Sequence, residues 1–464
     1  MRLGIAAVGV VALGVVTVLA VQRLNDAERF RQLVDTGERA LAAGNSYAAI
    51  EAFSGAIALR SDSMASHLRR GEAYRAQRRL EEAGRDFREA VRLQPGATEP
   101  LMALAALYEG QGNPAAAAEW LGRAAAIDRQ SPTLLYRLAL TRYRSGQAAA
   151  AREPLRQAVA LNPGFDEALY LLGLTLRDTQ DTAGAVEALE RAVRTNPSLA
   201  PAREELADLY RAQQRPAEEM AQLTALASQE PGTGRDVAIA LAQARRGDFD
   251  AADATLAAAA DRAPEDSSLA LTRGRVHVWR AEAVPPGPQR GRWATEAIPA
   301  LERALGGTVR RSEGLALYGR ALFLRGDIAD AARILREAVA TTPFSRLAFL
   351  YLADAAEALN DPIEARHWLL RYDALDGEVS APDIRAARTR RLGGLAVAAG
   401  DYRDARTRLE PLLTSAPQDV ELLGWIAEAR WHTGDIEQAR AALALGLSVA
   451  PRDATLRRLR PVIR

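Results

Sequence analysis

The sequence contains no cysteine and no lysine among its 464 residues. Without cysteine the chain cannot form disulfides, thiolate nucleophiles, cysteine-ligated zinc sites or iron–sulfur centres. Without lysine it has no phosphate-binding lysine of a P-loop, no kinase-type strand lysine and no residue for Schiff-base chemistry. All 60 basic residues are therefore arginine, a usage typical of a GC-rich bacterial genome.

The chain also has few aromatic residues and almost no net charge. Aromatic side chains make up 5% of the chain, and 59 acidic residues almost balance the 60 basic ones, which leaves a formal charge of +1. Such a balance does not attract nucleic acid, and we predict no nucleic-acid partner. The 48% of apolar residues are mostly alanine and leucine, which favour helices over strands.

An uncharged apolar run of 19 residues extends from Leu3 to Val21, between Arg2 and Arg23. A helix of this length matches the hydrocarbon thickness of a bilayer. We therefore predict a transmembrane helix that contacts the lipid bilayer through residues 3–21, with residues 1–29 as membrane anchor and short linker. A signal peptide cleaved near residues 18–20 is the alternative interpretation.

This span predicts a single-pass protein of the bacterial inner membrane. Arg23, Arg29, Arg31 and Arg39 follow the span, and a count of bases alone would keep the following domain in the cytoplasm. Long domains, however, are translocated largely regardless of flanking charge. We therefore favour a periplasmic, extracytoplasmic domain and keep the cytoplasmic location as the alternative.

The most informative feature is an internal repeat. The phrase "REAVRLQPGA" at 88–97 returns as "RQAVALNPGF" at 156–165 and as "ERAVRTNPSL" at 190–199, at multiples of 34 residues. A period of 34 residues is the length of a two-helix repeat. Twelve units begin at residues 30, 64, 98, 132, 166, 200, 233, 267, 312, 346, 386 and 420.

The unit at 166–199 shows why each repeat should fold as a helical hairpin. Leu169, Leu172 and Leu176 follow the spacing of one helix face, and Leu189 lies on the face of a second helix. Gly173 is small where the two backbones must approach. In other units glycine ends the first helix, aspartate or asparagine caps the second, and proline stops it.

In these residues the chain resembles the tetratricopeptide-repeat (TPR) family over about 420 residues. The resemblance implies an all-α, right-handed superhelix, an α-solenoid of about twelve helical hairpins, whose first helices line a concave surface. With the transmembrane helix in front, we expect the solenoid at 30–453 and a capping segment at 454–464. A Pro- and Gly-rich insertion at 281–292 predicts an exposed loop inside the eighth unit.

The sequence offers no catalytic constellation. The four histidines, His67, His277, His367 and His432, lie in four different units and form no metal-binding pair. Nucleophile-elbow, zinc-binding and phosphate-binding motifs are absent as well. We predict no enzyme activity, no catalytic residue, no cofactor and no metal, and we interpret His67 and His277 as core residues.

Partner binding in this family usually uses the groove formed by the first helices. When the family's groove positions are carried over to this sequence one by one, they form an apolar and aromatic stripe edged by arginine. Such a stripe would suit an extended or helical peptide with acidic groups. The alternative is that these side chains pack between neighbouring units. The candidate partner-binding residues are Met102, Tyr136, Leu140, Tyr143, Tyr170, Leu174, Arg144, Arg177 and Arg211.

Taken together, the sequence predicts a non-catalytic, membrane-anchored protein–protein interaction scaffold that assists assembly of a bacterial envelope complex. Its partners would be one or more proteins or peptide segments. One alternative is a stable accessory subunit of a large membrane complex. Another is a secretion or assembly factor associated with polysaccharide or peptidoglycan.

Overall fold

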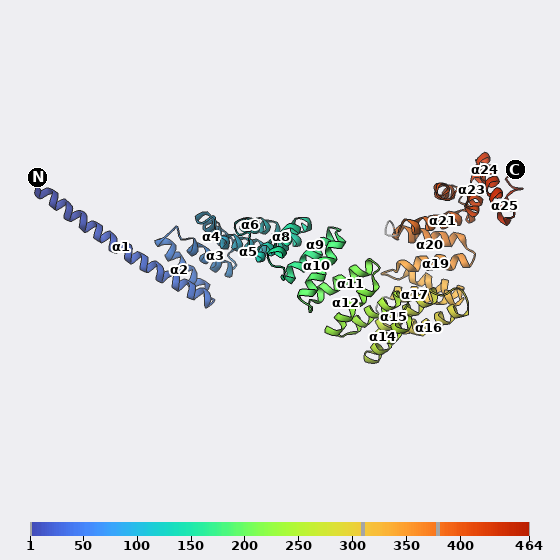
Figure 1. Ribbon diagram of the computed structural model, residues 1–464, viewed down its shortest axis with the longest axis horizontal. Coiled ribbons are helices and arrows are strands. Elements are labelled where there is room, and N and C mark those ends of the chain that lie inside the picture. The colour runs from blue at the N-terminus through green and yellow to red at the C-terminus, as the bar shows by residue number, and fades with distance from the viewer. Residues whose placement is uncertain (1, 308–310, 377–380, 464) are drawn as a thin grey trace. The chain divides into compact units, whose positions relative to one another are not determined.

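All regular structure in the described part of the chain is helical (Figure 1). A computed structural model describes residues 2–307, 311–376 and 381–463, and it describes side chains from Val21 onward. Within these ranges it contains 25 α-helices and one 3₁₀ helix, and no β-strand. The prediction of an all-α chain is confirmed.

The chain divides into two compact parts, Met1–Gln213 and Gln214–Arg464. The helices of the N-terminal part are α1 (Arg2–Ala42), α2 (Ser46–Leu59), α3 (Met64–Ala76), α4 (Leu80–Leu93), α5 (Thr98–Gly110), α6 (Pro114–Ile127), α7 (Pro132–Arg144), α8 (Ala148–Leu161), α9 (Asp166–Asp178), α10 (Thr182–Thr195) and α11 (Ala200–Ala212). The helices of the C-terminal part are α12 (Pro216–Gln229), α13 (Thr233–Arg245), α14 (Phe249–Arg262), α15 (Ser267–Glu282), α16 (Pro288–Leu305), α17 (Arg311–Arg325), α18 (Ile328–Ala340), α19 (Arg346–Ala358), α20 (Pro362–Asp376), α21 (Pro382–Ala398), α22 (Tyr402–Leu409), the 3₁₀ helix η1 (Glu410–Thr414), α23 (Val420–His432), α24 (Ile436–Val449) and α25 (Ala454–Leu459).

In the described residues the chain has the helices α1 to α24 that the predicted twelve hairpins require. Within each part an odd-numbered helix packs on the even-numbered helix that follows, and that helix packs on the next odd-numbered one. The right-handed sense of the superhelix and the division into segments 1–29, 30–453 and 454–464 stay predictions. Helix α1 runs without interruption through the proposed boundary at residue 29.

The turns between paired helices follow from local chemistry. Gly44 and Gly112 adopt a left-handed conformation, φ +71° at each, which only glycine reaches without strain. The next residue then caps the second helix: Asn45 accepts a hydrogen bond from the Ala48 amide, and Asn113 accepts one from the Ala116 amide. In each of these turns the glycine ends one helix and the asparagine starts the next.

The core of the N-terminal part follows the period of 34 residues. Large side chains of the second helices are completely buried at successive repeats, and so is a small residue four positions before each of them. Because a single hairpin cannot cover both faces of its helices, stacking the hairpins is what removes these side chains from water. The large residues are Phe53, Phe87, Leu121, Leu155 and Leu189, and the small ones are Ala49, Ala83, Ala117, Ala151 and Ala185.

The insertion of the eighth unit differs from the exposed loop predicted for residues 281–292. Only residues 283–287 connect α15 to α16, and the two helices are 16 and 18 residues long, against 13 and 14 in α9 and α10. Pro288 stands in the first turn of α16, where a missing backbone N–H costs nothing. The proline-rich stretch therefore starts a helix instead of extending a loop.

The membrane prediction requires a correction. Among the helices of the described residues, none combines the length and the apolar character that a bilayer crossing needs. This finding overturns the prediction of a single-pass inner-membrane protein, and the predicted bilayer contact is withdrawn with it. The predicted span, residues 3–21, belongs to α1, and the side chains of residues 2–20 lie outside the described ones.

Candidate functional site

The nine predicted partner-binding residues lie on the first helices of four successive repeats, all in the N-terminal part. We call them the first-helix surface: Met102 on α5, Tyr136, Leu140, Tyr143 and Arg144 on α7, Tyr170, Leu174 and Arg177 on α9, and Arg211 on α11. On α7 and α9 the residues recur at intervals of four and three, which places them on one helix face.

The apolar and aromatic members of this surface are half-buried. Met102, Tyr136, Leu140, Tyr143 and Tyr170 pack against the buried core of the N-terminal part. The ring of Tyr136 lies 5.1 Å from that of Phe165, centroid to centroid. These five side chains therefore pack on the core with one part, as the alternative interpretation expects, and leave another part exposed. Partner binding by this surface stays a prediction.

Polar side chains join the first helices into a continuous row. The Thr141 hydroxyl on α7 donates to Glu109 on α5 at 2.9 Å, and the Tyr143 hydroxyl donates to Asp178 on α9 at 2.7 Å. Arg177 on α9 in turn donates to Glu205 on α11. These contacts fix neighbouring first helices against each other and hold the aromatic residues between them.

The arginines of the surface are less available than the sequence suggests. Arg177 pairs with Glu205 and also with Asp178, at 2.9 Å, and Arg211 pairs with Asp208 at 2.5 Å. Only Arg144 is exposed without an ion pair to any carboxylate of the described ranges. Glu205 lies 28 residues after Arg177, and Asp178 lies 35 residues after Tyr143, so a search at about one repeat could have found these two partners.

Burial raises the pKa of the tyrosines of this surface. It raises the pKa of Tyr143 to about 12, and the hydrogen bond to Asp178 adds to the effect. Burial also raises the pKa of Tyr136 and the pKa of Tyr170. The surface therefore presents phenol groups that donate hydrogen bonds and carry no charge near neutral pH.

We expect the Tyr143 phenol to ionise near pH 12, whereas an unperturbed phenol ionises near pH 10. Between these values the unfolded chain loses the proton and the folded chain keeps it, so stability falls as pH rises through this window. Phenolate absorbance measures the titration. Tyr143→Phe should remove one of the phenols that ionise near pH 12 and leave Tyr351, whose pKa burial also raises to about 12. An unchanged high-pH titration in this variant would contradict the assignment.

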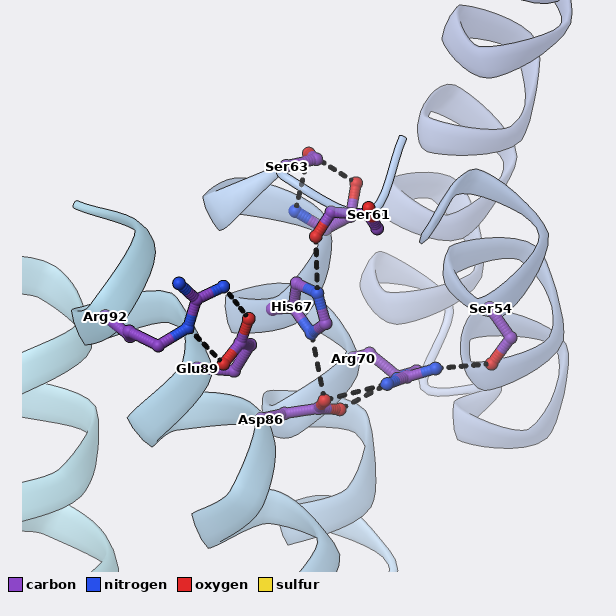
Figure 2. Close-up of polar contacts among 9 residues, drawn as sticks. Ser54, Ser61, Ser63, His67, Arg70, Asp86, Glu89 and Arg92 are labelled. Atoms are coloured by element: carbon purple, nitrogen blue, oxygen red, sulfur yellow. Dashed lines mark hydrogen bonds and ion pairs between the residues drawn. The ribbon is translucent and has the colours of Figure 1, made fainter. Parts of the chain in front are cut away.

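A buried polar cluster lies nearer the N-terminus, between α2, α3 and α4 (Figure 2). Asp86 on α4 accepts two hydrogen bonds of 2.8 Å from Arg70 and lies 3.1 Å from His67 Nδ1. The other ring nitrogen, Nε2, lies 3.2 Å from the Ser61 carbonyl oxygen. The partners of His67, Arg70 and Asp86 all come from the fold itself, which gives the cluster a structural role.

The remaining histidines form no shared site. His277 is buried as predicted, whereas His367 and His432 are exposed. No group of three or more acidic or histidine side chains within the described residues is arranged to hold a metal ion.

The paired helices and their connected first helices define an α-helical repeat protein. A profile of the tetratricopeptide repeat matches residues 34–98, 136–200, 172–232, 289–346 and 319–379, and a second profile of this repeat matches 396–460. These matches cover more than half of the sequence. The chain belongs to the tetratricopeptide-repeat family, whose members generally mediate protein–protein interactions and are generally not enzymes.

Several solved structures are similar to this chain at low sequence identity. PilF of Pseudomonas aeruginosa is 20% identical and covers 45% of this chain and 96% of its own, with a TM-score of 0.34. A tetratricopeptide repeat protein of Parabacteroides merdae is 15% identical, with coverages of 56% and 98% and a TM-score of 0.39. YrrB, described as a TPR protein with an unusual peptide-binding site, is 19% identical, with coverages of 40% and 96% and a TM-score of 0.36. TM-scores this low carry no argument about function, and no curated protein matches the chain.

Proposed function

We propose that this protein is a non-catalytic scaffold that binds a peptide segment of a partner protein on the first-helix surface. The observation that carries the proposal is the half-buried stripe of Tyr136, Leu140 and Tyr143 on α7 and Tyr170 and Leu174 on α9. Side chains already held by packing lose little conformational freedom when a partner covers their exposed parts, which favours binding. Tyrosine is also among the residues that contribute most at interfaces.

The charges on this surface narrow the chemistry of the peptide. Arg177 and Arg211 are neutralised by carboxylates of the chain itself, so they offer little to an acidic ligand. Arg144 remains as an exposed cation near Tyr136, and its positive charge partly offsets the rise in the Tyr136 pKa that burial causes. We therefore propose an apolar segment with one acidic residue placed to meet Arg144, rather than a strongly acidic peptide. A role in envelope assembly depended on the membrane span and is not part of the proposal.

A peptide library selected against the full chain should enrich such segments. The double variant Tyr136→Ser, Tyr170→Ser should bind the enriched peptides about tenfold more weakly or worse, because two aromatic contacts are lost. Isothermal titration of synthetic peptides measures the change, and circular dichroism checks that the variant is folded. Arg144→Met should weaken only those peptides that carry the acidic residue.

Tyr47→Ser is the matched control, because Tyr47 is 78% exposed and lies on α2, outside the first-helix surface. It should bind the peptides as the unsubstituted chain does. Failure to enrich any peptide would count against the proposal. So would peptides that bind the double variant and the unsubstituted chain with equal affinity.

A further inference from the structure

A groove of about 420 Å³ lies between α24 and the short helix α25 in the C-terminal part. Apolar side chains line it together with two arginines, one from α24 and one from the turn that follows α25. The residues that α24 contributes recur at intervals of three and four, so one face of this helix lines the groove. They are Arg440, Leu443, Ala444 and Leu447, and the other lining residues are Pro451, Arg460 and Ile463.

An earlier repeat covers the same face of its second helix with the helix that follows. Helix α10 has 14 residues, as α24 does, and its residues at the corresponding positions are Val186, Leu189, Glu190 and Val193. Val186 and Leu189 are buried, and Glu190 accepts a hydrogen bond of 2.6 Å from Tyr210 of the next helix, α11. Helix α11 has 13 residues, whereas α25 has six. The groove is the part of the α24 face that α25 leaves uncovered.

Helix α25 is anchored on the core, which gives the groove a defined shape. Its Leu456 and Leu459 are buried and belong to the same apolar cluster as Leu443 of α24. Gly446 of α24 makes room for α25, because a Cβ atom there would lie 2.8 Å from Cδ1 of Leu456. Asp453 caps α25 by accepting a hydrogen bond of 2.9 Å from the Leu456 amide. Walls that are already packed lose little conformational freedom when a partner binds.

Positive charge is concentrated at this end of the C-terminal part. Residues 436–463 contain five arginines and two carboxylates, although the formal charge of the whole chain is +1. Four of these arginines are exposed and make no ion pair with any carboxylate in the part of the chain that the structure describes: Arg452, Arg457, Arg458 and Arg460. Arg457 and Arg460 lie one helical turn apart, and Arg460 lines the groove. Cations without partners beside an apolar groove favour a ligand that brings carboxylates.

We propose that this groove binds an acidic amphipathic helix of a partner protein, which packs on α24 as α11 packs on α10. The apolar face of the partner helix contacts Ala444 and Leu447, and its flanking carboxylates pair with Arg457 and Arg460. A flat anionic bilayer reaches the exposed arginines but not the side chains inside the groove, so a helix fits the surface better. The site lies outside the first-helix surface and goes beyond peptide binding there, so either proposal can fail without the other.

A library of helical peptides tests the proposal. The peptides have about 15 residues, or four helical turns, with apolar residues at i, i+3, i+4 and i+7 and random charged or amide residues elsewhere. Selection uses the full chain with Tyr136→Ser and Tyr170→Ser, so that binding to the first-helix surface does not contribute. The selected peptides should carry net negative charge and bind the unsubstituted chain saturably, one per chain, by isothermal titration. Added salt should weaken them, because it screens exposed charges.

Two variants at exposed positions address the groove and its charge separately. Ala444→Gln places a longer, uncharged side chain in the groove, and the double variant Arg457→Glu, Arg460→Glu reverses the charge beside it. Each should weaken the selected peptides about tenfold or more, because packing is blocked or like charges meet. The matched control Arg385→Glu, Arg403→Glu reverses two exposed arginines of α21 and α22 that do not line the groove, and it should leave the affinity unchanged.

Several results would overturn the proposal. One is a selection that yields no saturable binder, or only peptides with net positive charge. Another is equal affinity of the selected peptides for Ala444→Gln and for the unsubstituted chain. Two measurements address other occupants of the groove. If no peptide binds, and Arg457→Glu, Arg460→Glu releases the chain from phosphatidylglycerol vesicles or separates a dimer in sedimentation, the surface serves lipid or a second copy, and the proposal is wrong.

Discussion

Replacing Asp86 by alanine should lower the free energy of unfolding of the N-terminal hairpins by about 3–5 kcal/mol. Asp86 is 5% exposed and is the carboxylate that both Arg70 and His67 face in the interior (Figure 2). Without it, the Arg70 guanidinium keeps only the hydroxyl of Ser54, at 3.2 Å, within a largely buried setting. A charge that is buried without its partner costs far more than the pair contributes, which explains the size of the effect.

Glu89→Ala, one turn further along α4, is the matched control. Glu89 pairs with Arg92 at 2.5 Å, but this pair lies at the surface (Figure 2). Water already solvates and screens both charges, so removing one should change stability little. Urea unfolding followed by circular dichroism, with hydrogen exchange of α3 and α4, measures both variants, since repeat arrays can unfold in sections. Equal losses for the two variants would show that burial of Asp86 is not the cause.

The period of 34 residues made the hairpins and their core predictable. Phe87 and Leu189 are both completely buried at the same position of their repeats, as the alternation of helix faces requires. A hairpin packs mainly on itself and on the next one, so its fold is encoded within about two repeats of sequence. The short Gly-Asn turns at residues 44–45 and 112–113 also follow from local chemistry alone.

The candidate site was only partly predictable, because its electrostatics depend on contacts between repeats. The sequence identifies Arg177 as a cation on the surface, but Glu205 of the next first helix neutralises it. A cavity around His277 also needs side chains from three helices, α14, α15 and α16, so it depends on packing between repeats. The apolar run at 3–21 gave a wrong prediction for a different reason. The hydropathy of the segment alone predicted a membrane-spanning helix, and none of the described helices is long and apolar enough to be one.

Substituting Gly173 by alanine should destabilise the N-terminal part by about 1–3 kcal/mol, although alanine is the better helix former. A Cβ atom at Gly173 of α9 would lie 2.5 Å from Cγ and 2.7 Å from Cδ2 of Leu189 on α10. Leu189 is completely buried, so it cannot turn away into solvent, and the two helices must separate. Ala105 and Ala139 occupy the same repeat position and are fully buried, so a hairpin can accept alanine with a small shift, which limits the cost.

Replacing Gly122 of α6 by alanine should instead raise the stability of the N-terminal part. A Cβ atom there would meet nothing within 4 Å, so the variant gains helix propensity without overpacking and should be stabilised by about 0.4–1 kcal/mol. Thermal and urea unfolding of the two variants, made in the same chain, compare the signs directly. Opposite signs mean that close approach of paired helices, rather than the flexibility of glycine, is why the repeat has glycine at residue 173. Stabilisation by both substitutions would refute this explanation, because the helices would then have room for a methyl group at either residue.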